Sequence, residues 1–171
     1  MTPTNSPRFP KLPPTLREQL SSITPSRDRQ IEHYPCDVWL HDGTIVKRVC
    51  VVSEIPYINQ RRVYPEKDCS ISISDVASLI ESPSRLPPRF ANELYRAGES
   101  GMGYRLFTVV FSRRFGILPR RQAYVTGASA LDFIEYPSGV GPKNVKAILP
   151  HVGRDASPRT CPKYSWCLYS E

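Results

Sequence analysis

The chain has 171 residues, a formal net charge of +7 and an isoelectric point near 9.3. With 40% hydrophobic residues, nine Tyr, six Phe and two Trp it can bury a core, which excludes a wholly disordered chain. Eighteen Pro residues exclude a bundle of long helices, because proline cannot continue a helix. The excess of basic residues favours acidic proteins, nucleic acids or anionic membranes as partners.

The first 32 residues carry six of the prolines, together with several Ser and Thr. Residues 1–32 show no sustained apolar periodicity, so we expect a flexible, extended, Pro-rich N-terminal tail. Within it, Pro13 and Pro14 suit the first turn of a short helix from Leu16 to Leu20. Such a helix would be able to dock on the domain or on a partner.

The cysteines and the N-terminal residues bear on the cellular compartment. The opening residues contain no apolar stretch typical of a signal peptide, and no apolar run is long enough to span a membrane. An odd number of cysteines without a leader predicts a cytoplasmic protein with free thiols. The five are Cys36, Cys50, Cys69, Cys161 and Cys167. Cys50 lies within an apolar run and is expected to be buried.

The clearest local prediction is a β-hairpin. Asp42-Gly43 separates two β-forming runs and predicts a two-residue type I′ turn, in which both central residues need a positive φ. That turn would pair Leu40 with Ile45, and Asp37 with Arg48 as a cross-strand ion pair. Alternation along the strands then predicts an inward face. Its members are Val38, Leu40, Ile45, Val49 and Val51.

The segment after this hairpin has weaker patterns. Residues 53–70 mix apolar and polar positions and predict an irregular connecting segment, with a short strand near Tyr57-Ile58. Ser70–Ile73 alternates and predicts a strand with both isoleucines inward. Residues 75–81 are compatible with a strand or with one helical turn.

The second half of the chain predicts a helix followed by strands. Residues 89–97 follow two prolines and precede Gly98, which is typical of a helix. Tyr104–Ser112 is apolar on both faces and predicts a central strand, which returns through residues 122–126. The remaining expected elements are a strand at 131–136, a short helix at 142–149 and an irregular C-terminal tail at 153–171.

A shift of 54 positions aligns Ile80-Glu81-Ser82-Pro83-Ser84 with Ile134-Glu135-Tyr136-Pro137-Ser138. Chance and a duplicated β unit are the two interpretations. We expect a β-rich globular domain at 33–152, between the tails, with repeat units near 33–98 and 103–150. The predicted fold class is α+β and β-rich. It has small curled antiparallel sheets or barrel-like units with two short helices, a pseudo-duplicated unit if the repeat is genuine, and the Pro-rich tail.

Enzymatic chemistry has one candidate nucleophile, Ser100, in the segment Gly98–Gly103. A serine in a tight glycine turn can attack a substrate if a histidine is positioned beside it. The segment resembles the Gly-Asp-Ser-Gly-Gly sequence of serine proteases, from which Glu99 and Met102 depart. The alternative is a loop that ends a helix and leads into a strand.

Metal and cofactor motifs are weak or missing in the sequence. Candidate metal ligands are His33, Cys36 and His41, or Cys161 and Cys167, but neither set has the paired spacing of a structural zinc site. The sequence contains no phosphate-binding loop and no dinucleotide motif. We therefore expect no metal and no cofactor.

The strongest polar cluster flanks an apolar turn at an expected hairpin tip. No acidic residue lies between positions 105 and 121, while Phe115 adds a stacking face and Ile117 an apolar anchor. Guanidinium groups bind phosphates or carboxylates, although such a loop can also be merely solvated. The predicted binding residues are Arg105, Arg113, Arg114, Phe115, Arg120 and Arg121.

These observations predict a non-enzymatic protein-interaction or adaptor module that binds an acidic surface of a partner protein through the basic hairpin. The alternative is a nucleic-acid-binding protein that contacts phosphates through Arg113, Arg114, Arg120 and Arg121. A third hypothesis is a small hydrolase with Ser100 as its nucleophile.

Overall fold

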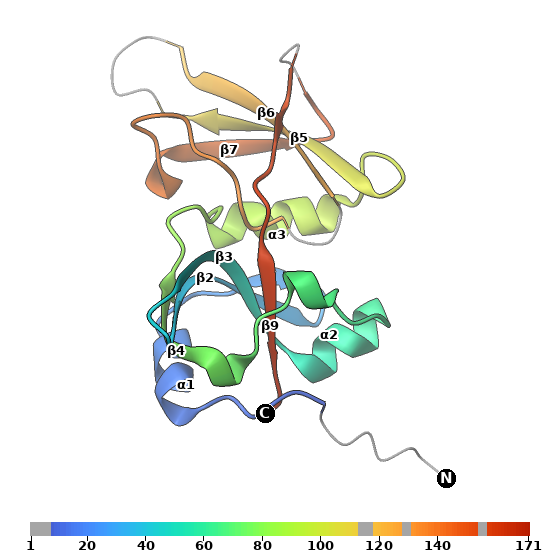
Figure 1. Cartoon of the computed structure of the whole chain (residues 1–171). Helices are drawn as coiled ribbons and strands as arrows, with labels where there is room; N and C mark the ends of the chain where they lie inside the picture. The colour runs from blue at the N-terminus through green and yellow to red at the C-terminus, as the bar shows by residue number, and fades with distance from the viewer. Residues whose placement is uncertain (1–7, 113–117, 128–130, 154–156) are drawn as a thin grey trace. The chain divides into compact units, whose positions relative to one another are not determined.

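The computed structural model describes residues 8–112, 118–127, 131–153 and 157–171, and the chain divides into two compact units (Figure 1). The first unit comprises residues 1–25, 29–82 and 164–171, and the second comprises residues 26–28 and 83–163. The units thus interleave along the chain. The described chain is α+β and strand-rich, with three α-helices and two sheets that do not close into a barrel.

The first unit is built on four strands of a five-stranded sheet, in the order β4-β2-β3-β9. Strand β2 pairs antiparallel with β3 and with β4, and β9 pairs parallel with β3. The strands are β2 (Ile31–Leu40), β3 (Ile45–Ser53), β4 (Val76–Glu81) and β9 (Ser165–Tyr169). The helices are α1 (Pro14–Ser21), α2 (Glu54–Arg61) and the 3-10 turns η1 (Lys67–Cys69) and η2 (Ile73–Asp75). The expected irregular C-terminal tail therefore contains a core strand.

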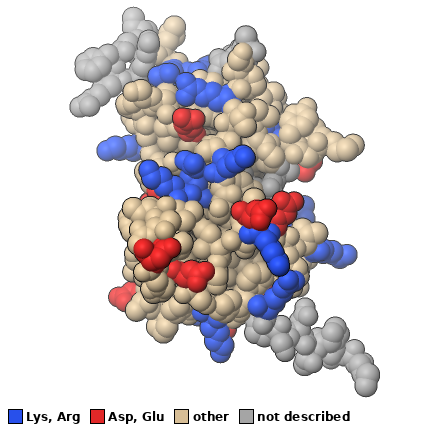
Figure 2. All heavy atoms as spheres, viewed as in Figure 1, with Lys and Arg blue, Asp and Glu red and all other residues tan. Residues whose placement is uncertain are grey.

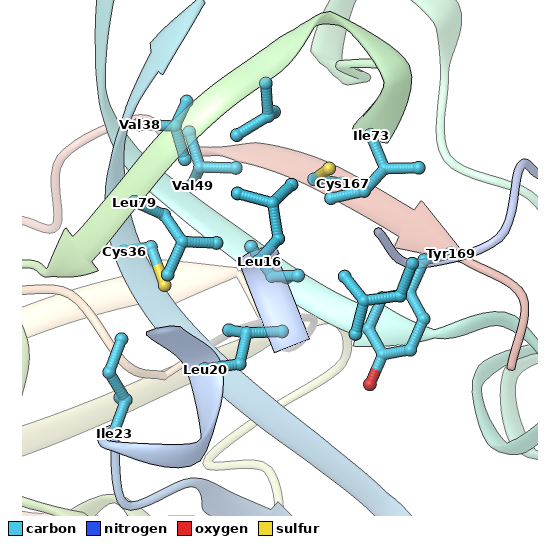
Figure 3. Close-up of a cluster of buried hydrophobic side chains, with 13 residues drawn as sticks. Leu16, Leu20, Ile23, Cys36, Val38, Val49, Ile73, Leu79, Cys167 and Tyr169 are labelled. Carbon is cyan, nitrogen blue, oxygen red and sulfur yellow. The ribbon is translucent and has the colours of Figure 1, made fainter. Parts of the chain in front are cut away.

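Helix α1 covers this sheet with an apolar stripe. Leu16 and Leu20 lie four residues apart, and both are buried in the cluster shown in Figure 3. The helix begins with proline in its first turn, where the missing N–H has no partner to lose. The short helix predicted within the N-terminal residues is therefore confirmed, and it docks on the sheet. Other buried members of the cluster include Leu12, Ile23, Cys36, Val38, Val49, Ile73, Leu79, Cys167 and Tyr169.

The flexible tail expected over residues 1–32 is not confirmed for its described part, residues 8–32. The backbone N–H groups of Arg8 and Phe9 donate to the buried Glu54 carboxylate at 3.0 and 3.3 Å. Leu12 N donates to the Ser170 carbonyl at 3.1 Å, and Ser170 N donates to the Pro10 carbonyl at 2.9 Å. The chain ahead of α1 is thus held by specific hydrogen bonds, as a buried backbone requires.

The hairpin of β2 and β3 is confirmed, but its predicted type I′ turn is wrong. Gly43 N donates to the Leu40 carbonyl at 3.0 Å, and Leu40 N donates to the Thr44 carbonyl at 2.8 Å. Gly43 has a φ of 87°, whereas Asp42 is not among the residues with positive φ. This is a three-residue loop, in which a type I turn is followed by a glycine in the left-handed region.

The longer loop shifts the strand register by one residue near the turn. Trp39 lies opposite Ile45 there, whereas beyond Asp37 the predicted register holds, with Cys36 opposite Val49. A β-bulge absorbs the difference at Arg48, which has a φ of 59°. The Asp37 carboxylate accepts the Arg48 backbone N–H at 3.0 Å, so this pair stabilises the bulge through the main chain.

The bulge reverses the inward face of β3 near the turn. Ile45, expected in the core, is 52% exposed, and Val46 packs against the cluster instead. Beyond the bulge Val49 and Val51 are fully buried as predicted, but Cys50 and Val52 are fully buried as well, so this part of β3 is covered on both faces and burial does not alternate.

Gly43→Val is expected to destabilise the chain by about 1 kcal/mol or more, because a β-branched residue resists a φ of 87°. A Cβ at this position would meet no atom within 4 Å, so the cost comes from the backbone and not from a clash. Gly43→Asn is the matched control and should lose less, since Asn tolerates the left-handed region. Equal urea midpoints for Gly43→Val and the wild type would contradict the loop geometry.

The segment between β3 and β4 differs from its prediction. Residues 54–61 form α2, with Pro56 in its first turn, in place of an irregular connecting segment with a strand near Tyr57-Ile58. Ile73 is buried as expected but lies in η2 and not in a strand. Of the two alternatives for residues 75–81, the strand is observed as β4.

The second unit has a four-stranded sheet in the order β7-β5-β6-β8, so β5 is central as predicted. Its elements are β1 (Ser26–Asp28), α3 (Pro88–Ala97), β5 (Tyr104–Phe111), β6 (Arg120–Gly127), the 3-10 turn η3 (Pro142–Asn144), β7 (Val145–Pro150) and β8 (Arg159–Thr160). The predicted α3 is confirmed, and it packs Phe90 and Leu94 into a core with Phe107, Phe111 and Tyr124. The strand expected at 131–136 and the helix expected at 142–149 are wrong. The first segment is irregular but largely buried, and the second contains η3 and β7.

Apart from α2 and η1, which only the first unit has, and β1, which only the second has, the described elements of the two units follow the same order, and the 54-residue shift does not align that order. Each has a helix that begins at a proline, a hairpin, a 3-10 turn and a strand antiparallel to the first hairpin strand. In each unit a further strand lies parallel to the second hairpin strand. Leu12-Pro13-Pro14 corresponds to Leu86-Pro87-Pro88, a shift of 74 positions. The proposed 54-residue duplication is not confirmed, because Ile80 lies in β4 and Ile134 lies outside any strand.

Among the described residues no helix combines the length and the hydropathy needed to cross a membrane. All five cysteines, each of them described, are free thiols, and Cys50 is fully buried as predicted.

Candidate functional site

The basic hairpin predicted from the sequence is the connection from β5 to β6. Arg120 and Arg121 are the first residues of β6, and both are exposed. They lie opposite Phe111 and Val110, so their side chains leave opposite faces of the sheet. The predicted residues Arg113, Arg114 and Phe115 lie outside the described residues.

Arg105 does not belong to the exposed surface, contrary to its prediction as a binding residue. It is only 8% exposed, and its Nη1 donates to the carbonyls of Leu94 and Gly98. These carbonyls lie at the C-terminal end of α3, where the last helical C=O groups lack partners within the helix. A cation is also favoured at this end of the helix dipole. Arg105 therefore stabilises the helix end.

A cavity of about 790 Å³ lies at the Arg120 end of the second sheet. Ser112 N donates to the Asn144 carbonyl at 2.7 Å, which ties the end of β5 to η3. Because β6 and β7 flank β5, this bond brings Arg120 and Lys143 to one end of the sheet. The lining residues are Ser112, Leu118, Pro119, Arg120, Gly139, Val140, Lys143 and Asn144. The described lining residues include two cations and no carboxylate.

The neutral polar groups of this cavity are engaged within the protein. The Ser112 hydroxyl donates to the Asn144 carbonyl at 3.2 Å, and Asn144 Oδ1 accepts the Gly141 N–H at 2.9 Å. By contrast, the side chains of Arg120 and Lys143 form no hydrogen bond or ion pair within the described parts of the chain. The cavity therefore offers positive charge beside an apolar wall formed by Leu118, Pro119 and Val140.

A further positive charge lies beside β6, close to Tyr124. Burial raises the pKa of Tyr124 to about 12, while the charges of Arg159 and Arg120 act in the opposite direction. Arg159 lies on β8, directly opposite Tyr124 in the sheet. The Tyr124 hydroxyl donates to the Glu135 carbonyl at 2.9 Å, so it is a structural group. Arg159 thus extends the positive surface that begins at Arg120.

Charge is divided unequally between the two units. The second unit carries 14 Lys and Arg against 6 Asp and Glu, a net charge of +8, and the first carries 9 against 10, a net charge of −1. Figure 2 shows several Lys and Arg side chains, and few acidic ones, on the visible face of the second unit. We define the basic surface of the second unit as Arg120, Arg121, Lys143 and Arg159. It includes both faces of β6 at Arg120 and Arg121, where β6 is an edge strand because β8 pairs only with Tyr124 and Val125. Sequence reasoning missed Lys143 and Arg159, although residues 136–154 contain no acid.

The structure places a histidine beside Ser100, the candidate nucleophile. Ser100 Oγ lies 3.0 Å from His151 Nδ1, and His151 Nε2 lies 2.9 Å from the Ala97 carbonyl. Ser100 Oγ also accepts the Leu106 N–H at 2.8 Å and lies 3.2 Å from the Leu106 carbonyl oxygen, so both polar groups of the Leu106 backbone hold this side chain. These bonds connect the end of α3 with the start of β5 and the end of β7. The arrangement fits a structural role for Ser100 and His151. This agrees with the interpretation of Gly98–Gly103 as a loop that ends a helix and leads into a strand.

The candidate metal ligands lie in different surroundings. His33 is fully buried and its Nδ1 lies 3.5 Å from the Cys50 Sγ. The Cys36 side chain belongs to the hydrophobic cluster of the first unit, and His41 is exposed. A structural zinc site needs four ligands around one point, which His33, Cys36 and His41 do not provide.

Comparison with known proteins adds no identification: no family model, no curated protein and no solved structure matches the chain.

Proposed function

We propose that the chain is a non-catalytic binding module that holds an acidic segment of a partner protein on the basic surface of its second unit. The observation that carries this proposal is the separation of charge, +8 on the second unit against −1 on the first. Such asymmetry raises the local concentration of an acidic partner and orients its approach. Arg120, Arg121 and Lys143 are exposed, so they are available for that contact.

Nucleic acid is the second candidate partner, because guanidinium groups also neutralise phosphates. The net charge of +8 on one unit favours this alternative as well. The apolar wall of the cavity favours a protein, since Leu118 is 73% exposed beside the two cations. Protein interfaces combine apolar anchors with charge, whereas phosphate contacts need charge alone.

A binding experiment with two probes tests the proposal. We expect a fluorescent 20-residue peptide of repeating Glu-Ser-Leu-Ser, named here the Glu-Leu peptide, to bind the full chain and to keep most of its affinity between 50 and 200 mM salt. A 20-nucleotide oligothymidine should bind more weakly, with the steep loss of affinity over this range, roughly three hundredfold for six contacts to a single strand, that phosphate neutralisation predicts.

Charge reversal then locates the contact. The double variant Arg120→Glu/Arg121→Glu should weaken peptide binding by more than tenfold, where tenfold is equivalent to roughly 1.4 kcal/mol. Its matched control is Lys47→Glu/Lys67→Glu, which makes the same change of net charge at exposed positions of the first unit. Equal losses in the two double variants would refute the assignment to the second unit. Tighter binding of oligothymidine than of the peptide would favour the nucleic-acid alternative.

A further inference from the structure

We infer that the cavity at the Arg120 end of the second sheet is a pocket for an acidic side chain and an apolar side chain two residues away in an extended peptide, because residues two apart share a face. This inference rests on the proposed function and names the part of the surface that gives it specificity. The volume of about 790 Å³ falls within the range of roughly 300–1,000 Å³ that is usual for ligand pockets.

The positions of Arg120 and Lys143 favour binding of an anionic group between them. Arg120 and Val145 both lie opposite Phe111, on the strands that flank β5, and Lys143 precedes Val145 by two residues. Neighbouring strands lie about 4.8 Å apart, so the two flanking backbones are roughly 10 Å apart. Arginine and lysine side chains are long enough to reach one carboxylate from both sides of such a gap, and a guanidinium offers it a two-pronged hydrogen bond.

The apolar wall of the cavity favours an apolar side chain next to the anionic group of the bound peptide. Leu118, Pro119 and Val140 line the same cavity as the cations. Leu118 is 73% exposed, so covering it would remove apolar surface from water. A bare phosphate or a polyglutamate chain would leave this wall uncovered. The Glu-Leu peptide, in which each Glu and the next Leu are two residues apart and share a face, would cover it while its carboxylate reaches the cations.

The first test separates the pocket from the general charge of the unit. Arg120→Glu and Lys143→Glu should each weaken binding of the Glu-Leu peptide to the full chain at least tenfold. Lys146→Glu is the matched control: it makes the same charge change at an exposed position of β7, three residues from Lys143 and outside the cavity lining. It should change the affinity less than twofold. Unchanged melting temperatures would show that the variants remain folded.

The second test addresses the apolar wall. Leu118→Ser should weaken binding of the Glu-Leu peptide about fivefold and leave binding of a matched Glu-Ser peptide unchanged, because only the first peptide covers Leu118. Since the leucine is largely exposed, the variant should fold normally.

The outcomes distinguish the pocket from the wider proposal. Equal losses for Lys143→Glu and Lys146→Glu, or no selectivity in Leu118→Ser, would overturn the pocket and leave binding by the basic surface intact. Failure of the wild type to bind either peptide would overturn both. Oligothymidine binding that all three charge reversals weaken equally, with no peptide binding, would replace the pocket by a phosphate-binding surface.

Discussion

Trp166→Ala is expected to reduce the free energy of unfolding of the first unit by about 3–5 kcal/mol, the usual cost of removing a large buried aromatic ring. The ring is only 6% exposed. Its centroid lies 5.1 Å from that of Tyr57, 5.4 Å from that of Tyr164 and 5.8 Å from that of His33, all at steep angles. Such edge-to-face contacts add to the gain from burial. Urea unfolding followed by far-UV circular dichroism measures the loss.

Two variants serve as controls for Trp166. Trp166→Phe keeps an aromatic ring in the site and should cost less than the alanine variant. Trp39→Ala removes the other tryptophan, which is only half-buried, and should also cost less. A smaller loss for Trp166→Ala than for Trp39→Ala would mean that β9 does not pack on the first unit in solution.

Arg105→Ala is expected to destabilise the second unit by about 2–4 kcal/mol without weakening peptide binding. Its guanidinium donates to the Leu94 and Gly98 carbonyls, and hydrogen bonds from a charged donor contribute about 1.5–3 kcal/mol. The variant would leave these carbonyls without the guanidinium and remove a cation from the helix terminus. Hydrogen exchange at the backbone amides of α3 would measure the change where it arises.

Arg121 differs from the buried Arg105 because it is exposed at the start of β6. Arg121→Ala should leave the unfolding free energy within about 0.5 kcal/mol of the wild type and lower the affinity for the acidic peptide. Arg105→Lys keeps the charge and should recover part of the stability lost in the alanine variant. If Arg105→Ala weakened peptide binding with no loss of stability, the burial of this side chain would be refuted.

Local signals in the sequence predicted the elements whose partners lie nearby in the chain. Prolines at the start and Gly98 after the end defined α3, and Asp42-Gly43 located the first hairpin, although not its turn type. The parallel strands β8 and β9 were missed, because their partners β6 and β3 lie tens of residues or more away and leave no local pattern. Residues 142–149 were misread because apolar positions at 145, 148 and 149 fit a helix, although they form β7.

The candidate site was predicted only in part for a similar reason. Clustering in the sequence identified Arg120 and Arg121, but it also included Arg105, because no local pattern shows that a strand residue will reach back to the end of α3. Lys143 was missed because it is 23 residues from Arg120 in the sequence, and only the pairing of β6 and β7 with β5 brings the two together. The charge separation also needed the boundaries of the units, which interleave along the chain.

The position of β9 has a consequence for synthesis on the ribosome. Residues 165–169 complete the sheet of the first unit, yet they are translated after every residue of the second unit. At about 5–20 residues per second, the delay after residue 82 is on the order of ten seconds, whereas a hairpin forms in about 1–10 μs. During that interval the edge of β3 that later pairs with β9 would be unpaired. An unpaired strand edge makes the nascent chain prone to aggregate. Translation speed across residues 83–164, and chaperones that cover strand edges, should therefore govern the yield of native protein.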